Sequence, residues 1–355
     1  MANRVNFNNS SNYAAYEEIG PVNNLILKIP PQFDNGYDDH AKVVLLDTYC
    51  MLWPDAVVKD SKPVMYFRHT DVANNKYRFG NIVDLGDKPL DVQKGVLHAD
   101  EAADASTPID EPYGIVNNNP EVLGLSSKGK VTQRYYRDKV TVKEGDYLDL
   151  TAYPWEGFTV YDHQSTYADC SCVFQPSTFF GTLDGKPILG LGSFDRLCMK
   201  QHTSGGFGTV PLAYIAFSAM GIRPDGRKEM VFASIGLNDG ARTIATYHLE
   251  GETPIISDSV DIEADWVHLP YVNDGTCVFK DASIYFGGKE FHFKGKWGTK
   301  GFLRKPRIEK HGQSQMFGSW YEGNTEYEHR LYYTFVESME AYDENLKKLG
   351  FNIID

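Results

Sequence analysis

Short apolar runs alternate with polar, turn-forming residues along most of this chain. The runs are rich in aromatic and β-branched side chains, and they occupy residues 42–46, 64–68, 77–83, 139–142, 213–218, 230–235, 243–249, 283–286, 291–294 and 332–336. Turn-forming groups separate them at Asn74-Asn75, Asp184-Gly185, Pro224-Asp225-Gly226, Asn238-Asp239-Gly240, Asn273-Asp274-Gly275 and Gly287-Gly288. Runs joined by tight turns are typical of antiparallel hairpins. The pattern therefore predicts an all-β protein built as a sandwich or barrel.

Helical periodicity is scarce. Residues 337–349 place Met339, Tyr342 and Leu346 on one stripe, which predicts a C-terminal helix. A weaker pattern indicates a short helix within residues 90–103. Residues 100–130 are rich in Asp, Pro, Asn and Ser and predict a long loop. The first 20 residues predict a flexible N-terminal arm.

Two pairs of segments in the sequence resemble each other, and each such similarity is called an echo below. Residues 185–194 and 288–297 each read as a hairpin turn, a strand and then a Gly-x-aromatic group. Residues 64–83 and 212–235 each hold an aromatic strand, a polar loop and a second strand. The two echoes together predict two related β units. We place these units at residues 21–185 and 186–355, after an arm at residues 1–20.

The charge balance narrows the choice of partners. The chain has 355 residues and a formal net charge of −13, with no local run of Lys and Arg. Nucleic acids and acidic membrane surfaces attract proteins through clustered cations, so both are disfavoured. No apolar stretch approaches the roughly 18 residues of a membrane span, and no apolar signal segment opens the chain. We therefore expect a cytoplasmic protein without nucleic-acid partners or membrane insertion.

The sequence lacks the common motifs for cofactors and metals. It contains no Walker loop, no dinucleotide-binding glycine motif and no His-Glu-x-x-His zinc motif. Its ten histidines are scattered without metal-ligand spacing. Its five cysteines form an odd, sparse set that fits reduced core thiols better than a disulfide framework. We expect neither a metal nor a cofactor.

Two clusters could carry chemistry in the middle of the chain. Asp195 and Arg196 end the first echoed strand, and Lys200 and His202 follow before a glycine-rich loop, as at a barrel mouth. The plainer interpretation is an exposed strand end with a local ion pair. Tyr161 and His163 flank an aspartate, so this segment could transfer protons. A solvated loop is the plainer alternative there.

A third cluster is aromatic. On a strand, Trp266 and His268 would face the same side and could line a site for a flat, apolar ligand, with Tyr271 close behind. The alternative is that Trp266 belongs to an ordinary core. Trp320 and Glu322 allow the same two interpretations, a ligand site or ordinary core. Burial could raise the pKa of the Glu322 carboxyl group and make it a proton donor.

Residues 181–196 (GTLDGKPILGLGSFDR) carry a family resemblance. A glycine, a hairpin turn, a short apolar strand, Gly-x-Gly and an aromatic residue before Asp-Arg resemble the start of the second barrel in two-domain lipocalin-like proteins. That family includes carotenoid 1,2-hydratases, AttH-like proteins, kievitone hydratase and fungal Diels–Alderases. The resemblance covers about residues 175–235, and it departs after Asp195-Arg196, where many relatives continue Ser-Trp-Gly.

The resemblance implies a fold and an activity. The fold would be two lipocalin-like antiparallel β-barrels or half-barrels packed together, with a C-terminal helix. The activity would be that of a cofactor-independent enzyme for a hydrophobic terpenoid or polyketide. Within the family, the fungal hetero-Diels–Alderases that join a humulene-type terpene to a tropolone quinone methide are most similar. A cycloaddition is the first expectation, and hydration or cyclisation is the next.

Site residues follow from these clusters and the resemblance. Those expected to be catalytic are Asp195, Arg196, Lys200, His202 and Glu322. Those expected to bind substrate are Tyr161, His163, Tyr214, Trp266, His268, Tyr271 and Trp320. A non-catalytic carrier of an apolar metabolite and a carbohydrate-active β protein remain alternatives, and the oligomeric state stays open.

Overall fold

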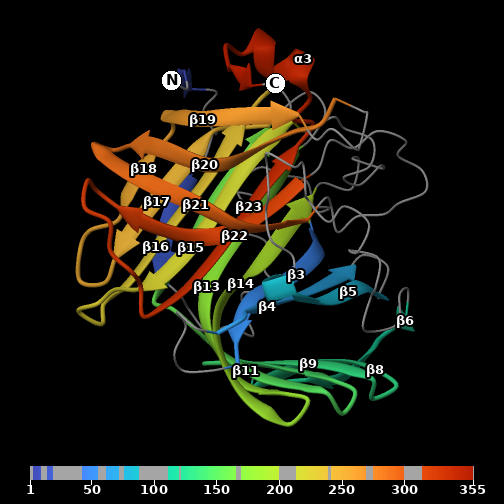
Figure 1. Ribbon diagram of the computed structural model, residues 1–355. Coiled ribbons are helices and arrows are strands. Elements are labelled where there is room, and N and C mark those ends of the chain that lie inside the picture. The colour runs from blue at the N-terminus through green and yellow to red at the C-terminus, as the bar shows by residue number, and fades with distance from the viewer. Residues whose placement is uncertain are drawn as a thin grey trace.

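The protein is almost entirely β-structure. A computed structural model describes residues 3–8, 14–18, 42–54, 61–71, 76–87, 111–119, 121–164, 169–199, 213–238, 241–268, 275–299 and 314–354. These residues form two large antiparallel sheets and one short C-terminal helix, which confirms the predicted fold class (Figure 1). No helix among them is long and apolar enough to cross a membrane.

The first sheet takes its strands mostly from the N-terminal half. Its order is β6-β5-β4-β3-β14-β13-β11-β10-β9-β8-β7, and β12 and β2 extend it from β13. The strands are β2 (Ala14–Glu18), β3 (Lys42–Trp53), β4 (Val64–Asp71), β5 (Lys76–Asp84), β6 (Glu111–Pro112), β7 (Gly114–Asn118), β8 (Val122–Ser127), β9 (Val131–Tyr136), β10 (Val140–Glu144), β11 (Leu148–Pro154), β12 (Gly157–Gln164), β13 (Asp169–Leu183) and β14 (Lys186–Met199). The 3-10 turn η2 (Leu85–Asp87) follows β5.

The second sheet holds the later strands. Its order is β1-β19-β20-β21-β22-β23-β15-β16-β17-β18, with β24 parallel to β19. The elements are β1 (Arg4–Phe7), β15 (Tyr214–Ile222), β16 (Lys228–Gly236), β17 (Ile244–Leu249), β18 (Ile255–Ser257), β19 (Val260–His268), β20 (Cys277–Phe286), β21 (Lys289–Thr299), β22 (Ser314–Glu322), β23 (Leu331–Met339), α3 (Asp343–Lys348) and β24 (Ile353–Ile354). Both ends of the chain lie beside β19 (Figure 1).

Two echoed turns have the same backbone geometry. Asp184 and Gly185 have φ values of 49° and 72°, and Gly287 and Gly288 have 56° and 76°. Two successive positive φ values define the tight hairpin turn whose twist matches that of paired strands. The turns lead into β14 and β21, as the echo predicts. The second echo is confirmed too, since its two segments form the hairpins β4–β5 and β15–β16.

Two local predictions are wrong in part. The helix expected at 337–349 begins only at Asp343, because β23 continues to Met339 as a paired strand and Glu340 takes a φ of 58°. The loop expected at 100–130 contains β7 and β8, which pair with each other, while β8 also pairs with β9. The helix expected within 90–103 lies outside the described residues.

The first residues and the domain boundary also differ from expectation. Within the arm predicted at residues 1–20, β1 pairs with β19 of the second sheet and β2 pairs with β12 of the first. The boundary placed between residues 185 and 186 cuts the β13–β14 hairpin inside the first sheet. The change of sheet comes instead between β14 and β15.

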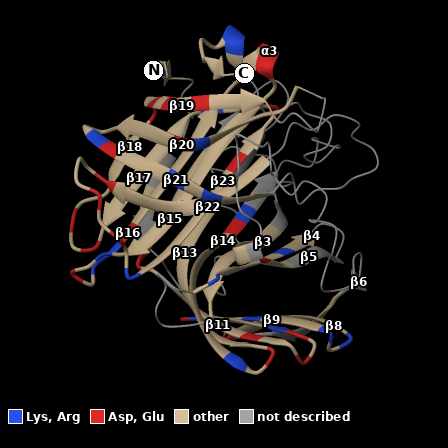
Figure 2. Cartoon of the chain, in the orientation of Figure 1, with Lys and Arg blue, Asp and Glu red and all other residues tan. Residues whose placement is uncertain are grey.

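Apolar side chains form three clusters. One lies within the first sheet, one within the second, and the third contains residues of both sheets, such as Met51, Trp53, Phe174, Phe232 and Phe335. Charged residues mark many of the turns between strands and also occur within strands such as β14 and β19 (Figure 2). The third cluster makes the sheets one packed body, and a functional site between them would be built from both.

Candidate functional site

Polar side chains gather between the sheets where several strands begin or end. On β3, Tyr49 contacts Phe335 of the second sheet, so alternate residues of this strand face that sheet. The group, called the interface cluster below, comprises Asp47, Tyr49, His69, Tyr161, Cys172, Ser193, Asp195, Tyr214, Tyr333 and Glu337. Its residues come from the middle of β3, the end of β4, from β12, the start of β13, the second half of β14, the start of β15 and from β23.

Asp47 is central to the first sheet's contribution. Strand register places it directly opposite Asp195 on one side and His69 on the other. His69 Nδ1 lies 2.8 Å from Asp47 Oδ1, and Tyr49 Oη donates to Asp47 Oδ2 at 3.2 Å. A neutral imidazole with its proton on Nδ1 has Nε2 as its basic nitrogen. This carboxylate–imidazole pair can therefore accept a proton.

Asp195 has the properties of an acid. Burial raises the pKa of its carboxyl group well above the ordinary value; the Ser193 hydroxyl opposes this shift, and the charge of Asp47 adds to it. Its Oδ1 atom has no hydrogen-bond partner. A carboxyl group in this setting keeps its proton at higher pH than usual, so it can donate a proton or a hydrogen bond.

The second sheet adds a phenol and a carboxylate. Tyr214 Oη donates to Glu337 Oε2 at 2.7 Å, and Gln315 Nε2 donates to Glu337 Oε1 at 3.3 Å. Burial raises the pKa of Tyr214 well above its ordinary value, and Glu337 raises it further. Burial and Asp47 do the same to Tyr49. Both phenols therefore remain protonated hydrogen-bond donors.

Aromatic rings surround the polar groups. The Tyr49 ring stacks on Phe67 with centroids 4.5 Å apart and meets Phe335 at 4.9 Å. Phe335 in turn contacts Phe317 edge-on at 5.8 Å. Apolar walls of this kind suit an apolar molecule, and they lower the local dielectric around Asp195.

The cluster is partly accessible. Asp47, Tyr49, Asp195, Tyr214 and Glu337 each retain some exposed surface. Ser193 and Tyr333 are fully buried. The cluster therefore has an accessible rim and a buried floor.

Three of the predicted site residues meet in this cluster: Asp195, Tyr161 and Tyr214. Arg196 does not join them. Neighbouring residues of a strand face opposite sides, and the Arg196 guanidinium lies 5.7 Å from the centre of the Phe158 ring. Arg196 is buried there, on the other face of the strand from Asp195, although its charge still lowers the pKa of Asp195.

Trp266 and His268 lie elsewhere. Trp266 is fully buried and packs edge-on against Phe279 at 4.8 Å and Phe351 at 5.7 Å, within the second sheet's core. His268 Nε2 lies 3.2 Å from Asp343 Oδ2 on α3. The arrangement follows the plainer alternative, in which Trp266 is core.

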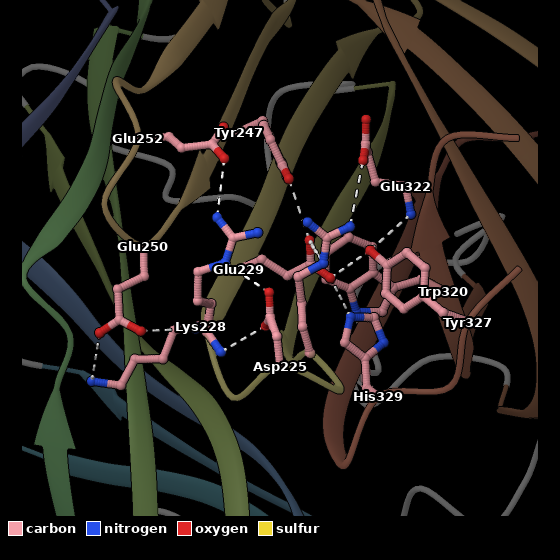
Figure 3. A network of polar contacts seen from close by, with 12 residues as sticks. Asp225, Lys228, Glu229, Tyr247, Glu250, Glu252, Trp320, Glu322, Tyr327 and His329 are labelled. Atoms are coloured by element: carbon pink, nitrogen blue, oxygen red, sulfur yellow. Dashed lines mark hydrogen bonds and ion pairs between the residues drawn. The ribbon is translucent and has the colours of Figure 1, made fainter. Parts of the chain in front are cut away.

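Trp320 and Glu322 belong to a separate polar network around Glu229 (Figure 3). Glu229 is fully buried and accepts a hydrogen bond from Tyr327 Oη at 2.6 Å. His329 Nε2 lies 2.5 Å from the same carboxylate oxygen. The Trp320 ring meets His329 at 4.7 Å, and its Nε1 donates to a backbone carbonyl at 2.9 Å.

Glu322 completes this network as an ion-paired carboxylate. It lies 3.1 Å from Lys289 and 3.6 Å from Arg223, and Arg223 also reaches Glu229 at 3.5 Å. Arg223 of this network follows the end of β15, and His329 precedes the start of β23. Tyr214 and Glu337 of the interface cluster lie at the other end of each strand. The groups of the Glu229 network satisfy one another, which is typical of a structural network.

For four predicted site residues, the side chain lies outside the described part of the structure. Lys200, His202 and Tyr271 lie outside the described residues. The backbone of His163 is in β12, opposite Cys170 in register, and its side chain lies outside the described part. Within the described ranges, no group of three or more His, Cys, Asp or Glu side chains is arranged to hold a metal ion.

Sequence reasoning missed Asp47, His69, Ser193 and Tyr333. They are far apart in the chain, and only strand pairing and sheet packing bring them together. One signal was available: Asp47 and Tyr49, at a spacing of two, lie between the predicted apolar run at residues 42–46 and a second apolar segment at residues 50–53. Polar residues on one face of a buried strand indicate a site or a polar contact on that face.

Comparison with known proteins gives distant structural likenesses only. No family model and no curated protein sequence matches the chain. A protein assigned as AttH from Nitrosomonas europaea is 12% identical with a TM-score of 0.42, over 89% of this chain and 97% of that one. Kievitone hydratase from Nectria haematococca is 10% identical with a TM-score of 0.35, over 96% and 99%. Likenesses this distant carry no argument about activity.

Proposed function

We propose that the interface cluster is the active site of an enzyme that protonates an apolar substrate, in a hydration or a proton-initiated cyclisation. One observation carries the proposal: Asp195 is desolvated, has an oxygen without a partner and stands beside the Asp47–His69 pair. A protonated carboxyl group next to a carboxylate–imidazole pair places an acid beside a base, as proton-transfer chemistry requires.

In the hydration of an alkene, Asp195 and His69 would have separate roles. Neutral Asp195 gives its proton to one alkene carbon, and the electrons of the double bond form the new C–H bond. Water adds to the cationic carbon, and His69 Nε2 takes the proton that the water loses. That proton returns to Asp195 through solvent, so the sum is alkene plus water giving alcohol. In a cyclisation, a second double bond of the substrate takes the place of water.

The surroundings favour an apolar substrate. Desolvation is the main cause of the raised pKa values of Asp195, Tyr49 and Tyr214, although each side chain keeps some exposed surface. An apolar substrate that reaches these groups would therefore meet little competing water. The rings of Tyr49 and Phe335 provide apolar walls and can stabilise a cation.

Asp195→Asn tests the proposal. The amide keeps a hydrogen-bond donor but cannot transfer a proton, so hydration of apolar alkenes in H₂¹⁸O should fall by about 10²–10⁴-fold in kcat. The control is Asp149→Asn, an exposed carboxylate of the first sheet. Mass spectrometry of the ¹⁸O-labelled alcohol measures the rate. An Asp195→Asn variant with the full wild-type rate would refute the acid role.

A cycloaddition is the second candidate, and the protonated phenols favour it. Tyr49 and Tyr214 are neutral donors that can polarise a carbonyl without giving up a proton, and holding diene and dienophile together lowers the barrier further. In that case Asp195→Asn should reduce the rate by less than about 10-fold, and no ¹⁸O should enter the product. A carrier would bind such molecules without any turnover above the spontaneous rate.

A further inference from the structure

The floor of the interface cluster holds polar atoms that lack partners. Ser193 Oγ, Asp195 Oδ1 and Tyr333 Oη are buried, and none of them makes a hydrogen bond of normal geometry. The Ser193 hydroxyl is nevertheless near enough to both other groups to lower the pKa of Asp195 and of Tyr333 against the effect of burial. Ser193 and Asp195 come from β14 of the first sheet, and Tyr333 comes from β23 of the second. The side chains of Ser193 and Tyr333 have no exposed surface.

These three atoms lie close to one another. Ser193 and Asp195 are two residues apart on one strand and therefore share a face. The pKa of Tyr333 is raised well above its ordinary value by burial and then by the charge of Asp195, which places the phenol within electrostatic reach of that carboxyl. The groups converge from both sheets beside the proposed acid.

Unpartnered buried polar groups are costly, so their grouping needs a reason. Each costs about 1–3 kcal/mol when no partner is present. Glu144 shows a fully satisfied buried group, because it accepts from Arg68, Tyr66 and Tyr147 at 2.6–2.8 Å. Unpartnered buried atoms also occur outside the cluster, on Ser127, Gln175 and Trp266, but the interface cluster brings several together. A polar atom of a ligand on the cluster floor would relieve this cost when it binds.

We infer that Ser193 Oγ and Tyr333 Oη form a subsite for one oxygen atom of the substrate. A serine hydroxyl can donate and accept, and a protonated phenol donates, so the pair suits a carbonyl, phenol or alcohol oxygen. The substrate is then an oxygen-bearing apolar molecule rather than a pure hydrocarbon. Ser193 and Tyr333 select it and place the adjoining carbon atoms beside Asp195. The inference rests on the proposed function for its location, because it names the substrate class of the same cluster.

A matched pair of probes tests the subsite. 2-Naphthol and naphthalene differ by one oxygen, and their dissociation constants are measured by titration with ligand-observed NMR. The wild-type chain should bind 2-naphthol at least about 10-fold more tightly than naphthalene. Tyr333→Phe should reduce this preference by about 5–20-fold and leave naphthalene affinity within about twofold. Ser193→Ala should act in the same direction.

Two controls keep the test decisive. Tyr247→Phe removes the hydroxyl of another buried tyrosine, one that donates to Glu229 outside the cluster, and should leave the preference unchanged. Because Tyr333 Oη makes no hydrogen bond of normal geometry within the protein, Tyr333→Phe should keep or raise the Tm. An unchanged 2-naphthol preference in Tyr333→Phe would overturn the subsite. A lower Tm with that unchanged preference would show a permanently bound water at the hydroxyl and would overturn it as well.

Binding and turnover separate the two proposals. If Asp195→Asn retains full activity while Tyr333→Phe loses the 2-naphthol preference, the acid role fails and the subsite stands. If Asp195→Asn loses activity while the probe preference is the same in wild type and Tyr333→Phe, the subsite fails and the acid role stands.

Discussion

At the scale of single residues, the environment of a side chain matters more than its type. The chain contains 48 aspartates and glutamates. Asp195 is set apart by desolvation and by the nearby charge of Asp47, whereas Glu322 is neutralised by Arg223 and Lys289. The sequence names both as candidate acids, and it cannot separate them, because burial and ion pairing arise only after the strands pack.

The raised pKa of Asp195 predicts a pH-dependent stability. Above its ordinary pKa of 3.8, the unfolded chain releases the proton while the folded protein still holds it. The folded state then binds more protons, so stability falls as pH rises from about 4 towards the folded pKa. Asp195→Asn removes this dependence.

Urea unfolding at several pH values between 4.5 and 8 measures the effect. The stability of Asp195→Asn relative to wild type should increase with pH, by at most about 1.4 kcal/mol per pH unit. Taking the difference between the two proteins cancels the other titrating groups. Parallel curves for the two proteins would contradict a raised pKa.

The buried pair of Arg68 and Glu144 predicts a large loss of stability. Both side chains are fully buried and joined by two contacts of 2.6 Å. Arg68→Met leaves the carboxylate of Glu144 buried without its cation, so the free energy of unfolding should fall by about 3–5 kcal/mol. Arg227→Met breaks an exposed pair with Asp225 and should change stability by less than about 1 kcal/mol. Equal effects of the two variants in urea melts would argue against the buried pair.

At the scale of elements, turns were more predictable than strand ends. Positive φ values at Asp184-Gly185 and Gly287-Gly288 need the residue types found there, so the turns show in the sequence. The end of β23 cannot be recognised in the sequence, because the apolar residues of 337–349 are spaced as on one face of a helix. Pairing of β23 with β15 overrides that local preference up to Met339.

The Gly-x-Gly of β14 has a structural reason. A Cβ at Gly192 would collide with the Tyr49 carbonyl oxygen and with Cys50 on β3, and one at Gly190 would lie 2.5 Å from the Met51 carbonyl oxygen. Close approach of β14 to β3 sets Asp195 opposite Asp47. The glycines that carry the family resemblance therefore also position the interface cluster.

Gly192→Ala tests this close approach. The variant should lose about 2–4 kcal/mol of stability, because the clash involves backbone that cannot move aside cheaply. Gly114→Ala on β7 is the matched control: it meets no atom within 4 Å and should change stability by less than about 1 kcal/mol. Thermal melts of both variants measure the loss of stability. An unchanged stability of Gly192→Ala would show that β14 tolerates a wider spacing from β3.

At the scale of the whole molecule, composition and pattern predicted two β units but not how they share strands. The strand β14 follows the echoed turn yet pairs with β13 and β3 of the first sheet. Pairing partners are chosen by register and packing over long sequence distances, and neither leaves a local signal. The residues that face each other across the sheets, including Asp47 and Tyr333, were for this reason beyond sequence reasoning.

The layer between the sheets predicts that they unfold together. Trp53 is fully buried there, donates its Nε1 hydrogen to the Tyr332 carbonyl at 3.1 Å and meets the Tyr332 ring at 4.9 Å. Trp53→Ala should reduce stability by about 3–5 kcal/mol and keep a single transition, with fluorescence and circular dichroism in agreement. The exposed Tyr153 gives the control variant Tyr153→Ala. Two separate transitions, only one of them shifted, would mean that the sheets fold independently.

The pairing of β1 with β19 has a consequence for protein synthesis. The partner of Arg4 is Glu263, which the ribosome adds about 260 residues later. At about 5–20 residues per second, β1 of the nascent chain waits roughly 13–50 s for the neighbour it needs. The pace of translation thus sets how long this strand stays open to pairing with other nascent chains. Slow codons ahead of residue 260 would lengthen that exposure without changing a single native contact.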